Sequence, residues 1–118
     1  MTLSTPAEAM KAELRRDLVA AMKRGDKAEV ALLRQLVAAL DNAEAVPTTG
    51  SGAVPLPFGE GTAEAKRHHL TEEDIQALIR WEMDERMVAV AEFARLGVEP
   101  RAAALAAEVE LIGRYVRS

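Results

Sequence analysis

The sequence predicts an all-α fold of four helices, arranged as two antiparallel hairpins that are joined by a long loop rich in proline and glycine. Composition is the first reason: alanine is the most frequent residue and aromatic residues make up only 3% of the 118 positions, a mixture that favours helices over strands. The second reason is that apolar residues recur at helical spacing in four separate segments. The third is that the links within each pair of segments are short, whereas the middle link is long.

The first helix is predicted over residues 5–24. Thr5 is suited to the N-cap position and Pro6 to the first helical position, where its missing N–H and fixed φ are tolerated. Gly25 is a typical helix stop. The apolar stripe of this segment recurs every fourth residue, at Met10, Leu14, Leu18 and Met22.

The second helix is predicted over residues 26–45. Asp26, followed three residues later by Glu29, matches a capping box. Because only three residues separate the two periodic segments, they are expected to fold back on each other as an antiparallel hairpin. The buried face of the second segment is predicted to contain Val30, Leu33, Val37 and Leu40.

Residues 46–70 show no helical pattern and are predicted to form a flexible loop. Three prolines and four glycines interrupt this segment, and a connection of this length in a small domain is typically disordered or functional. Its one apolar island is residues 54–58, Val-Pro-Leu-Pro-Phe, in which the two prolines favour an extended conformation. Two interpretations stay open: a free docking peptide, or a segment whose Phe58 fills a gap between the hairpins.

The third and fourth helices are predicted over residues 71–96 and 100–117. Thr71 and Asp74 form a capping box at the start of the third, and Gly97 is placed in the left-handed position after its end. Pro100 begins the fourth helix. The chain is therefore expected to be a single domain over 1–118, in which each hairpin packs against the other or against a partner. The expected stripes are Ile75, Ile79, Met83, Met87, Val90 and Ala94 in the third helix, and Leu105, Val109, Ile112 and Val116 in the fourth.

Charge and composition exclude several classes of protein. The net charge of −4 argues against a protein that binds nucleic acid over its whole surface, although a local basic patch stays open. The absence of cysteine excludes disulfide scaffolds and thiol catalysis. Neither a signal peptide nor a membrane-length apolar run is found, so a soluble, cytoplasmic protein without membrane contact is expected.

No constellation for catalysis stands out. The hydroxyl residues lie at helix caps, in the loop or near the termini, without the base that nucleophilic catalysis needs, and no phosphate-binding glycine motif is present. His68 and His69 are adjacent and cannot share one helix face, and no third ligand follows at a recognisable spacing. We therefore expect no independent active site, no cofactor and no metal.

Two basic groups are candidates for nucleic-acid contact. One is Lys66 and Arg67 beside the histidine pair; the other is Arg15 and Arg16 on the first helix. The alternative is local charge balance, because the basic pair at 66–67 precedes an acidic helix start. Trp81, the one tryptophan, is expected either to pack against the first hairpin or to mark a partner surface.

The order of several short motifs resembles YqeY-like proteins of the GatB/YqeY family. The similarity covers most of the chain outside residues 46–69, and its family-motif positions here are Arg34, Asn42, Glu44 and Arg86. The segments that carry it are residues 20–27, 33–44, 70–74, Arg86 with Glu92, Phe93 and Gly97, and residues 107–110 with Tyr115. The middle loop is longer and richer in proline and glycine than the family pattern.

The resemblance implies an all-helical accessory module rather than a catalyst. Members of the family are similar to part of the glutamine-dependent amidotransferase, a carbon–nitrogen ligase that converts mischarged Glu-tRNA or Asp-tRNA. Full-length members have a second, small helical part, and this chain resembles the N-terminal part only. The implied partners are tRNA or an amidotransferase-type protein. The alternative hypothesis is a protein-interaction or self-assembly module, including a homo-oligomer, without a tRNA role; glutaminase activity of this chain alone is not expected.

Overall fold

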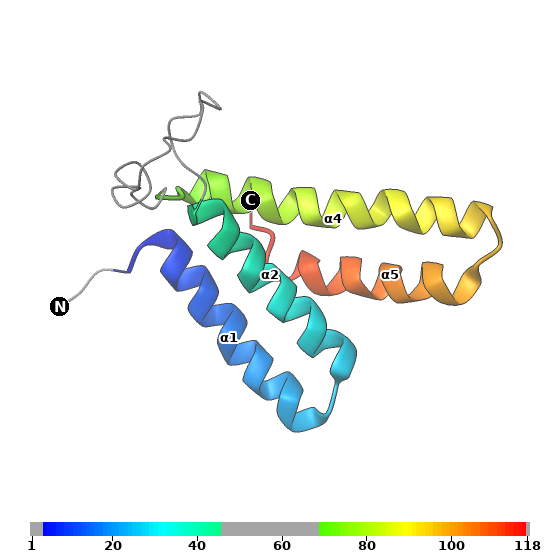
Figure 1. Cartoon of the computed structure of the whole chain (residues 1–118), viewed down its shortest axis with the longest axis horizontal. Helices are drawn as coiled ribbons and strands as arrows, with labels where there is room; N and C mark the ends of the chain where they lie inside the picture. Colours follow the sequence, from blue (N-terminus) through cyan, green and yellow to red (C-terminus); the bar gives the residue numbers. More distant parts are fainter. Residues whose placement is uncertain (1–3, 46–68, 118) are drawn as a thin grey trace, which may run out of the picture.

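A computed structural model describes residues 4–45 and 69–117. These residues form four helices and no strand, which confirms the predicted all-α class. Figure 1 shows two antiparallel hairpins, α1 with α2 and α4 with α5, that cross at an angle and meet near one end of α4. The helices are α1 (Pro6–Arg24), α2 (Lys27–Ala45), α4 (Glu72–Arg95) and α5 (Glu99–Gly113).

The first hairpin has the caps that the sequence predicts. The Thr5 hydroxyl accepts the Glu8 N–H at 3.1 Å, and the Glu8 carboxylate accepts the Thr5 N–H in return. Gly25 adopts a φ of 74°, the left-handed conformation that glycine reaches without strain. At the start of α2 the predicted capping box is only half formed: Asp26 accepts the Glu29 N–H at 3.1 Å, but the Asp26 N–H donates to the Ala21 carbonyl and the Glu29 carboxylate binds Arg24 and Arg114.

The second hairpin begins with a full capping box between Thr71 and Asp74. Gly97 has a φ of 79° and turns the chain between α4 and α5. The fourth helix departs from the prediction of 100–117, because it begins at Glu99 and ends at Gly113. Residues 114–117 leave the helical path, and their polar groups bond to α1, α2 and α4 instead.

The core lies where the two hairpins meet. It consists of one face of α1, one face of α2, the first two turns of α4 and the end of α5. Leu70 belongs to this core and is buried, so the predicted loop over 46–70 extends too far at its C-terminal end; residues 46–68 lie outside the described residues. The buried apolar residues of the core are Ala7, Met10, Leu14, Ala21, Leu32, Leu33, Leu36, Leu40, Leu70, Ile75, Ile79, Ile112 and Tyr115.

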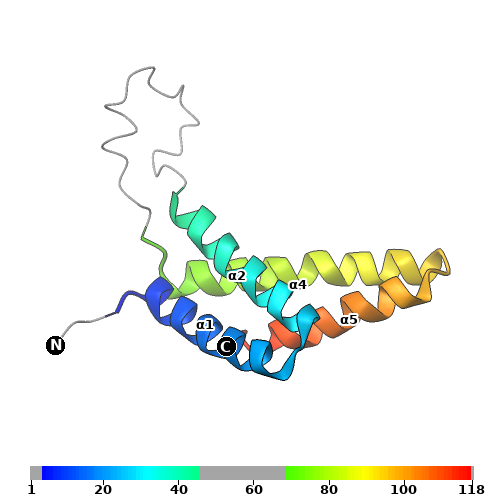
Figure 2. The same cartoon turned by 60° about the horizontal axis from the view of Figure 1, so that its bottom comes forward.

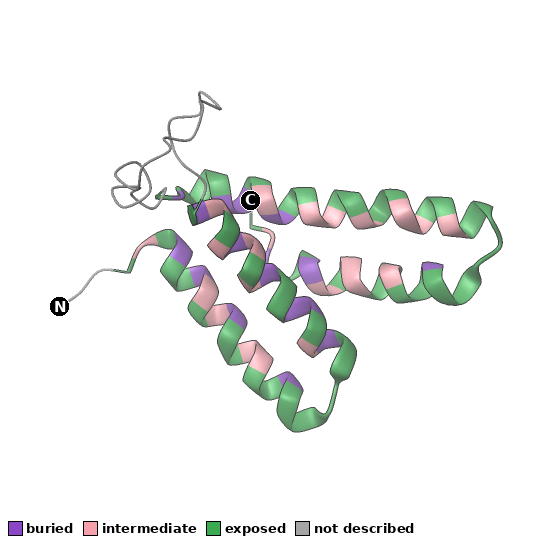
Figure 3. Ribbon diagram, viewed as in Figure 1, coloured by how far each residue is buried: buried purple, intermediate pink, exposed green. Residues whose placement is uncertain are grey.

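The outer half of the second hairpin extends beyond the first. We call residues 87–107 the arm; it consists of the end of α4, the Gly97 turn and most of α5, and Figures 1 and 2 show it projecting past α2 in both views. Buried positions are concentrated at the other end of the hairpin (Figure 3). Met87 and Ala94, which the helical spacing places in the buried stripe, are exposed here because the arm has no helix of the first hairpin opposite them.

Among the described residues, no helix combines the length and the apolar character that crossing a bilayer requires.

Candidate functional site

Arg86 connects three helices at the base of the arm. Its Nε donates to Glu108 of α5 at 2.7 Å, its Nη1 donates to Glu82 one turn earlier at 2.8 Å, and its Nη2 donates to Gln35 of α2 at 2.9 Å. Burial alone would lower the pKa of Arg86, but the hydrogen bonds to Glu82 and Glu108 outweigh it and raise the pKa. Arg86 is therefore a permanent cation that fixes the arm to α2.

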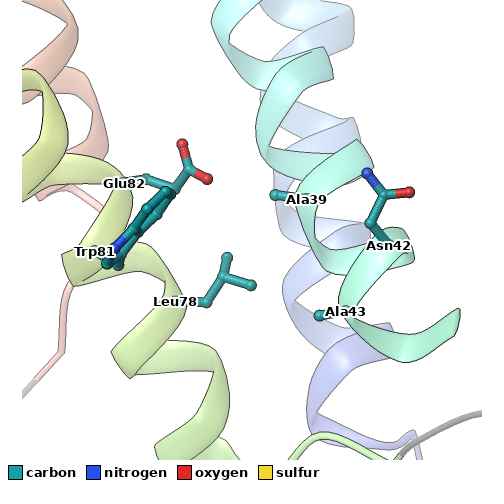
Figure 4. Close-up of a pocket in the computed structure, with 6 residues that line it drawn as sticks. All are labelled: Ala39, Asn42, Ala43, Leu78, Trp81 and Glu82. Atoms are coloured by element: carbon teal, nitrogen blue, oxygen red, sulfur yellow. The ribbon is translucent and has the colours of Figure 1, made fainter. Parts of the chain in front are cut away.

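A groove lies beside this network, between the C-terminal half of α2 and the N-terminal half of α4. It has a volume of about 410 Å³. Leu78 points across it from α4 toward Ala39 and Ala43 on α2, as Figure 4 shows. Trp81 lines the same groove and is 58% exposed. Its full lining is Ala39, Asn42, Ala43, Leu78, Trp81 and Glu82.

The chemistry of this groove suits an apolar ligand. Two small alanine side chains on one wall leave room opposite a leucine and an indole ring, and polar groups are limited to one amide, Asn42, and one carboxylate, Glu82. The Glu82 carboxylate is already bound to Arg86. Apolar pockets with a few polar groups at defined positions are typical of binding sites. The arrangement offers burial of apolar surface, not acid–base chemistry.

A second network closes the interface between the hairpins on the side of α1. Glu29 is only 3% exposed, and its two carboxylate oxygens accept hydrogen bonds from Arg24 at 2.5 Å and from Arg114 at 3.4 Å. Buried carboxylates require such partners because the loss of hydration is costly. Glu29 thus ties α2 to the residue directly after α5.

The segment 114–117 continues this network. The Tyr115 hydroxyl donates to Asp17 of α1 at 2.5 Å, and the Arg117 guanidinium donates to Glu13 at 2.7 Å. Burial, followed by the hydrogen bond to Asp17, raises the pKa of Tyr115 above its ordinary value of 10.0. The carbonyl of Tyr115 accepts the buried amide of Gln76 at 3.0 Å. We call residues 114–117 the C-terminal strap.

The predicted nucleic-acid residues are only partly covered by the structure. Arg15 and Arg16 are both exposed on α1, and Arg16 has a long contact of 3.9 Å with its neighbour Asp17. Lys66 and Arg67 lie outside the described residues. The structure therefore shows one of the two basic groups, on the face of α1 that points to solvent.

The four family-motif positions do not converge on one point. Arg34 is exposed, Asn42 lines the groove, and Arg86 holds the base of the arm. Glu44 is nearly buried and accepts a hydrogen bond from Lys11 at 2.7 Å. Hydrogen bonds to Asp41 and then to Glu44 raise the pKa of Lys11, so that this lysine keeps its charge in the α1–α2 interface.

Sequence reasoning missed Glu29, Gln35, Gln76 and Tyr115 as parts of these networks. The signal for Gln76 was its place three residues before Ile79, a spacing that puts both on one side of the helix, where a polar residue needs a buried partner. Within residues 4–45 and 69–117, no group of three or more histidine or acidic residues could hold a metal ion. Comparisons with protein-family models, with curated proteins and with solved structures found no match for this chain.

Proposed function

We propose that this chain is a non-catalytic helical module that docks onto a protein partner through its arm. The observation that carries the proposal is the exposure of large apolar side chains on a hairpin that projects from the core. Val88 is 70% exposed and Leu96 is 59% exposed, and Met87 and Val98 are also exposed on the same segment. Exposed apolar surface on a projecting hairpin is a feature that interaction sites commonly have.

The charge of the second hairpin supports a protein partner. Residues 69–117 contain ten acidic and six basic residues, whereas residues 4–45 contain seven of each. Acidic surface repels phosphates and favours a basic protein surface. The arm itself is balanced, because residues 87–107 contain two acidic and two basic residues. It is therefore suited to an apolar patch of a protein partner, and the acidic excess of this hairpin lies outside the arm.

The resemblance to the GatB/YqeY family leads us to propose which partner this is. A tRNA-dependent, glutamine-dependent amidotransferase is the protein with which an accessory module of this kind would work, in the cytoplasm. The exposed pair Arg15 and Arg16 on α1 would then contact the tRNA, on the hairpin whose acidic and basic residues are balanced in number. The alternative is a self-assembly module in which the arm packs against the arm of a second copy.

The docking proposal is tested by titrating the purified protein into a reconstituted amidotransferase and measuring binding by calorimetry. Val88→Asp should weaken binding at least tenfold, because a charge would be buried in the interface. The matched control is Val19→Asp, which changes a valine of α1 that is 50% exposed and should leave binding unchanged. Equal losses in both variants, or wild-type binding by Val88→Asp, would contradict the proposal. Light scattering separates the alternative, since self-assembly requires a mass that rises with concentration.

Contact with tRNA is tested separately by mobility shift at low salt. The double substitution Arg15→Ala and Arg16→Ala should weaken binding and reduce the salt dependence of the affinity by about two ion equivalents. Arg95→Ala, which removes an exposed cation of the acidic hairpin, is the control. No shift by the wild-type protein at tens of micromolar would overturn direct tRNA contact without affecting the docking proposal.

A further inference from the structure

The acidic excess of the second hairpin lies beside the α2–α4 groove. Residues 72–86 contain six acidic and two basic residues, whereas the arm is balanced. We infer that the groove, together with Asp84 and Glu85, binds a basic amphipathic helix of a partner protein. Such a helix has a large apolar side chain with lysine or arginine one turn before and after it. The inference is independent of the arm, because neither the lining residues nor the two carboxylates belong to residues 87–107.

Trp81 connects the negative charge to the apolar surface. Asp84 and Glu85 follow it by three and four residues, and residues at these spacings share one face of a helix. All three side chains are exposed. Glu82 lines the groove directly, across from Ala39 of α2, as Figure 4 shows. Three carboxylates therefore lie within one turn of the indole ring.

The chain neutralises this charge only in part. The guanidinium of Arg86 is already engaged in the three-helix network described above. Arg80, the other cation of this stretch, donates to a carbonyl of the C-terminal strap. Within residues 4–45 and 69–117, no side chain pairs with Asp84 or Glu85. Both carboxylates are thus available to a lysine or an arginine of a partner, and such pairs give an interface its selectivity and speed of association.

The shape of the groove favours a helix as its occupant. Ala39 and Ala43 lie one turn apart on α2, and their methyl groups allow a partner backbone to approach closely. Leu78 and Trp81 supply the larger apolar surface opposite. The volume of about 410 Å³ is at the lower end of the range for ligand sites, roughly 300–1,000 Å³. It therefore suits one or two anchor side chains of a docked helix.

The same charges select against other apolar ligands. A fatty acid or a phospholipid would bring an anionic group next to the carboxylates of residues 82–85, and like charges at an interface are repelled. A basic helix instead places its cations against these carboxylates and its apolar side chain in the groove. Charge and apolar surface thus point to the same class of partner.

Trp81 provides a direct readout, because it is the one tryptophan of the chain. The probe is a capped helical peptide of about 16 residues with a central leucine, lysine three and four residues to either side, and alanine elsewhere. It should protect Trp81 from acrylamide in a saturable way and lower the quenching constant at least twofold. A peptide with glutamate for each lysine, or with alanine for the leucine, should bind at least tenfold more weakly.

Reversing the charge of the protein tests the role of the carboxylates. The double substitution Asp84→Lys and Glu85→Lys should weaken binding of the lysine peptide at least tenfold and enable binding of the glutamate peptide. The matched control is Glu99→Lys with Glu110→Lys, which makes the same change in net charge at two exposed positions of α5 and should bind as the wild type does. Circular dichroism checks that the helices persist in both proteins.

Filling the groove tests the place of binding. Ala39→Leu puts a large side chain into the groove and should weaken binding of the lysine peptide at least tenfold. Ala38→Leu changes the exposed neighbour, which does not line the groove, and should have no effect. Val88→Asp should also bind the peptide as the wild type does, so that the groove and the arm can fail separately.

Three results would overturn the inference. The lysine and glutamate peptides could bind the wild-type protein equally, or neither could protect Trp81 at about 1 mM peptide. Ala39→Leu could bind as the wild type does, which would place the peptide outside the groove. Protection of Trp81 without peptide could rise with protein concentration, which would assign the groove to a second copy of the chain.

Discussion

The two ends of the second hairpin differ in what stabilises them. At one end, Ile75, Ile79, Ile112 and Tyr115 are buried against α1 and α2, and the C-terminal strap adds hydrogen bonds across the same interface. At the other end, the arm consists of two helices that have only each other, with one cation–π contact between Arg101 and Phe93 at 5.7 Å. The same helices are thus part of the central core over half of their length and pack only on each other over the other half. The difference shows that helix formation and burial are separate properties of this sequence.

The largest expected effect comes from removing core volume. Leu33 is fully buried, so Leu33→Ala should lower the free energy of unfolding by about 3 kcal/mol, through lost burial and the cavity left behind. Leu96→Ala makes the same change in the arm and should alter it by less than about 0.5 kcal/mol. Urea denaturation of the two variants checks this. Similar losses would mean that the arm is buried in solution, for example by self-association.

An intermediate effect is expected for the C-terminal strap. Tyr115→Phe removes the hydrogen bond to Asp17 and should cost about 1–2 kcal/mol near neutral pH.

The cost of that substitution should depend on pH in the alkaline range. The folded state raises the pKa of Tyr115 above 10.0, so it favours the protonated phenol. This contribution is complete below pH 10 and declines as the pH rises above that value, because the unfolded chain then releases the proton. The stability difference between wild type and Tyr115→Phe should therefore shrink above pH 10, as measured by denaturation at a series of pH values. A constant difference would show that ionisation of the phenol is not linked to folding. The raised pKa of Lys11 also makes stability depend on alkaline pH, but it does so equally in both proteins and therefore cancels in the difference.

A small, local effect is expected at the Gly97 turn of the arm. Gly97→Ala places a side chain at a φ of 79° with no neighbour within 4 Å, so the cost is backbone strain of about 1 kcal/mol. Hydrogen exchange should show lower protection for arm amides, while the amides of α1 and α2 exchange as in the wild type. Equal loss of protection in both regions would instead make the whole chain one cooperative unit.

Local features of the fold were predictable from the sequence. The caps at Thr5 and Thr71 and the turns at Gly25 and Gly97 depend on residues only a few positions apart, and all four are present. Helical spacing also identified much of the core, including Leu14, Leu33 and Ile79. It could not show where the opposing hairpin ends, which is why Met22 and Met87 follow the pattern but are exposed.

The candidate site was less accessible to such reasoning. The pair Glu82 and Arg86 was predictable because it is four residues apart on one helix. The contacts of Arg86 with Gln35 and Glu108 depend on how the hairpins cross, and the groove beside them results from that crossing angle. Trp81 was recognised as either a packing or a partner residue, and the structure places it, largely exposed, at the groove beside α2.

The strap has a consequence for the order in which the protein can assemble. Asp17 and Tyr115 are separated by 98 positions, and Glu13 and Arg117 by 104. During synthesis, α1 and α2 leave the ribosome long before the residues that complete their interface with the second hairpin. The faces of the first hairpin that contact α4 and the strap stay uncovered until those residues have been made, and contacts of such long range are slow to form. Until the strap is made, these faces of the nascent first hairpin are open to misassociation and to chaperone binding.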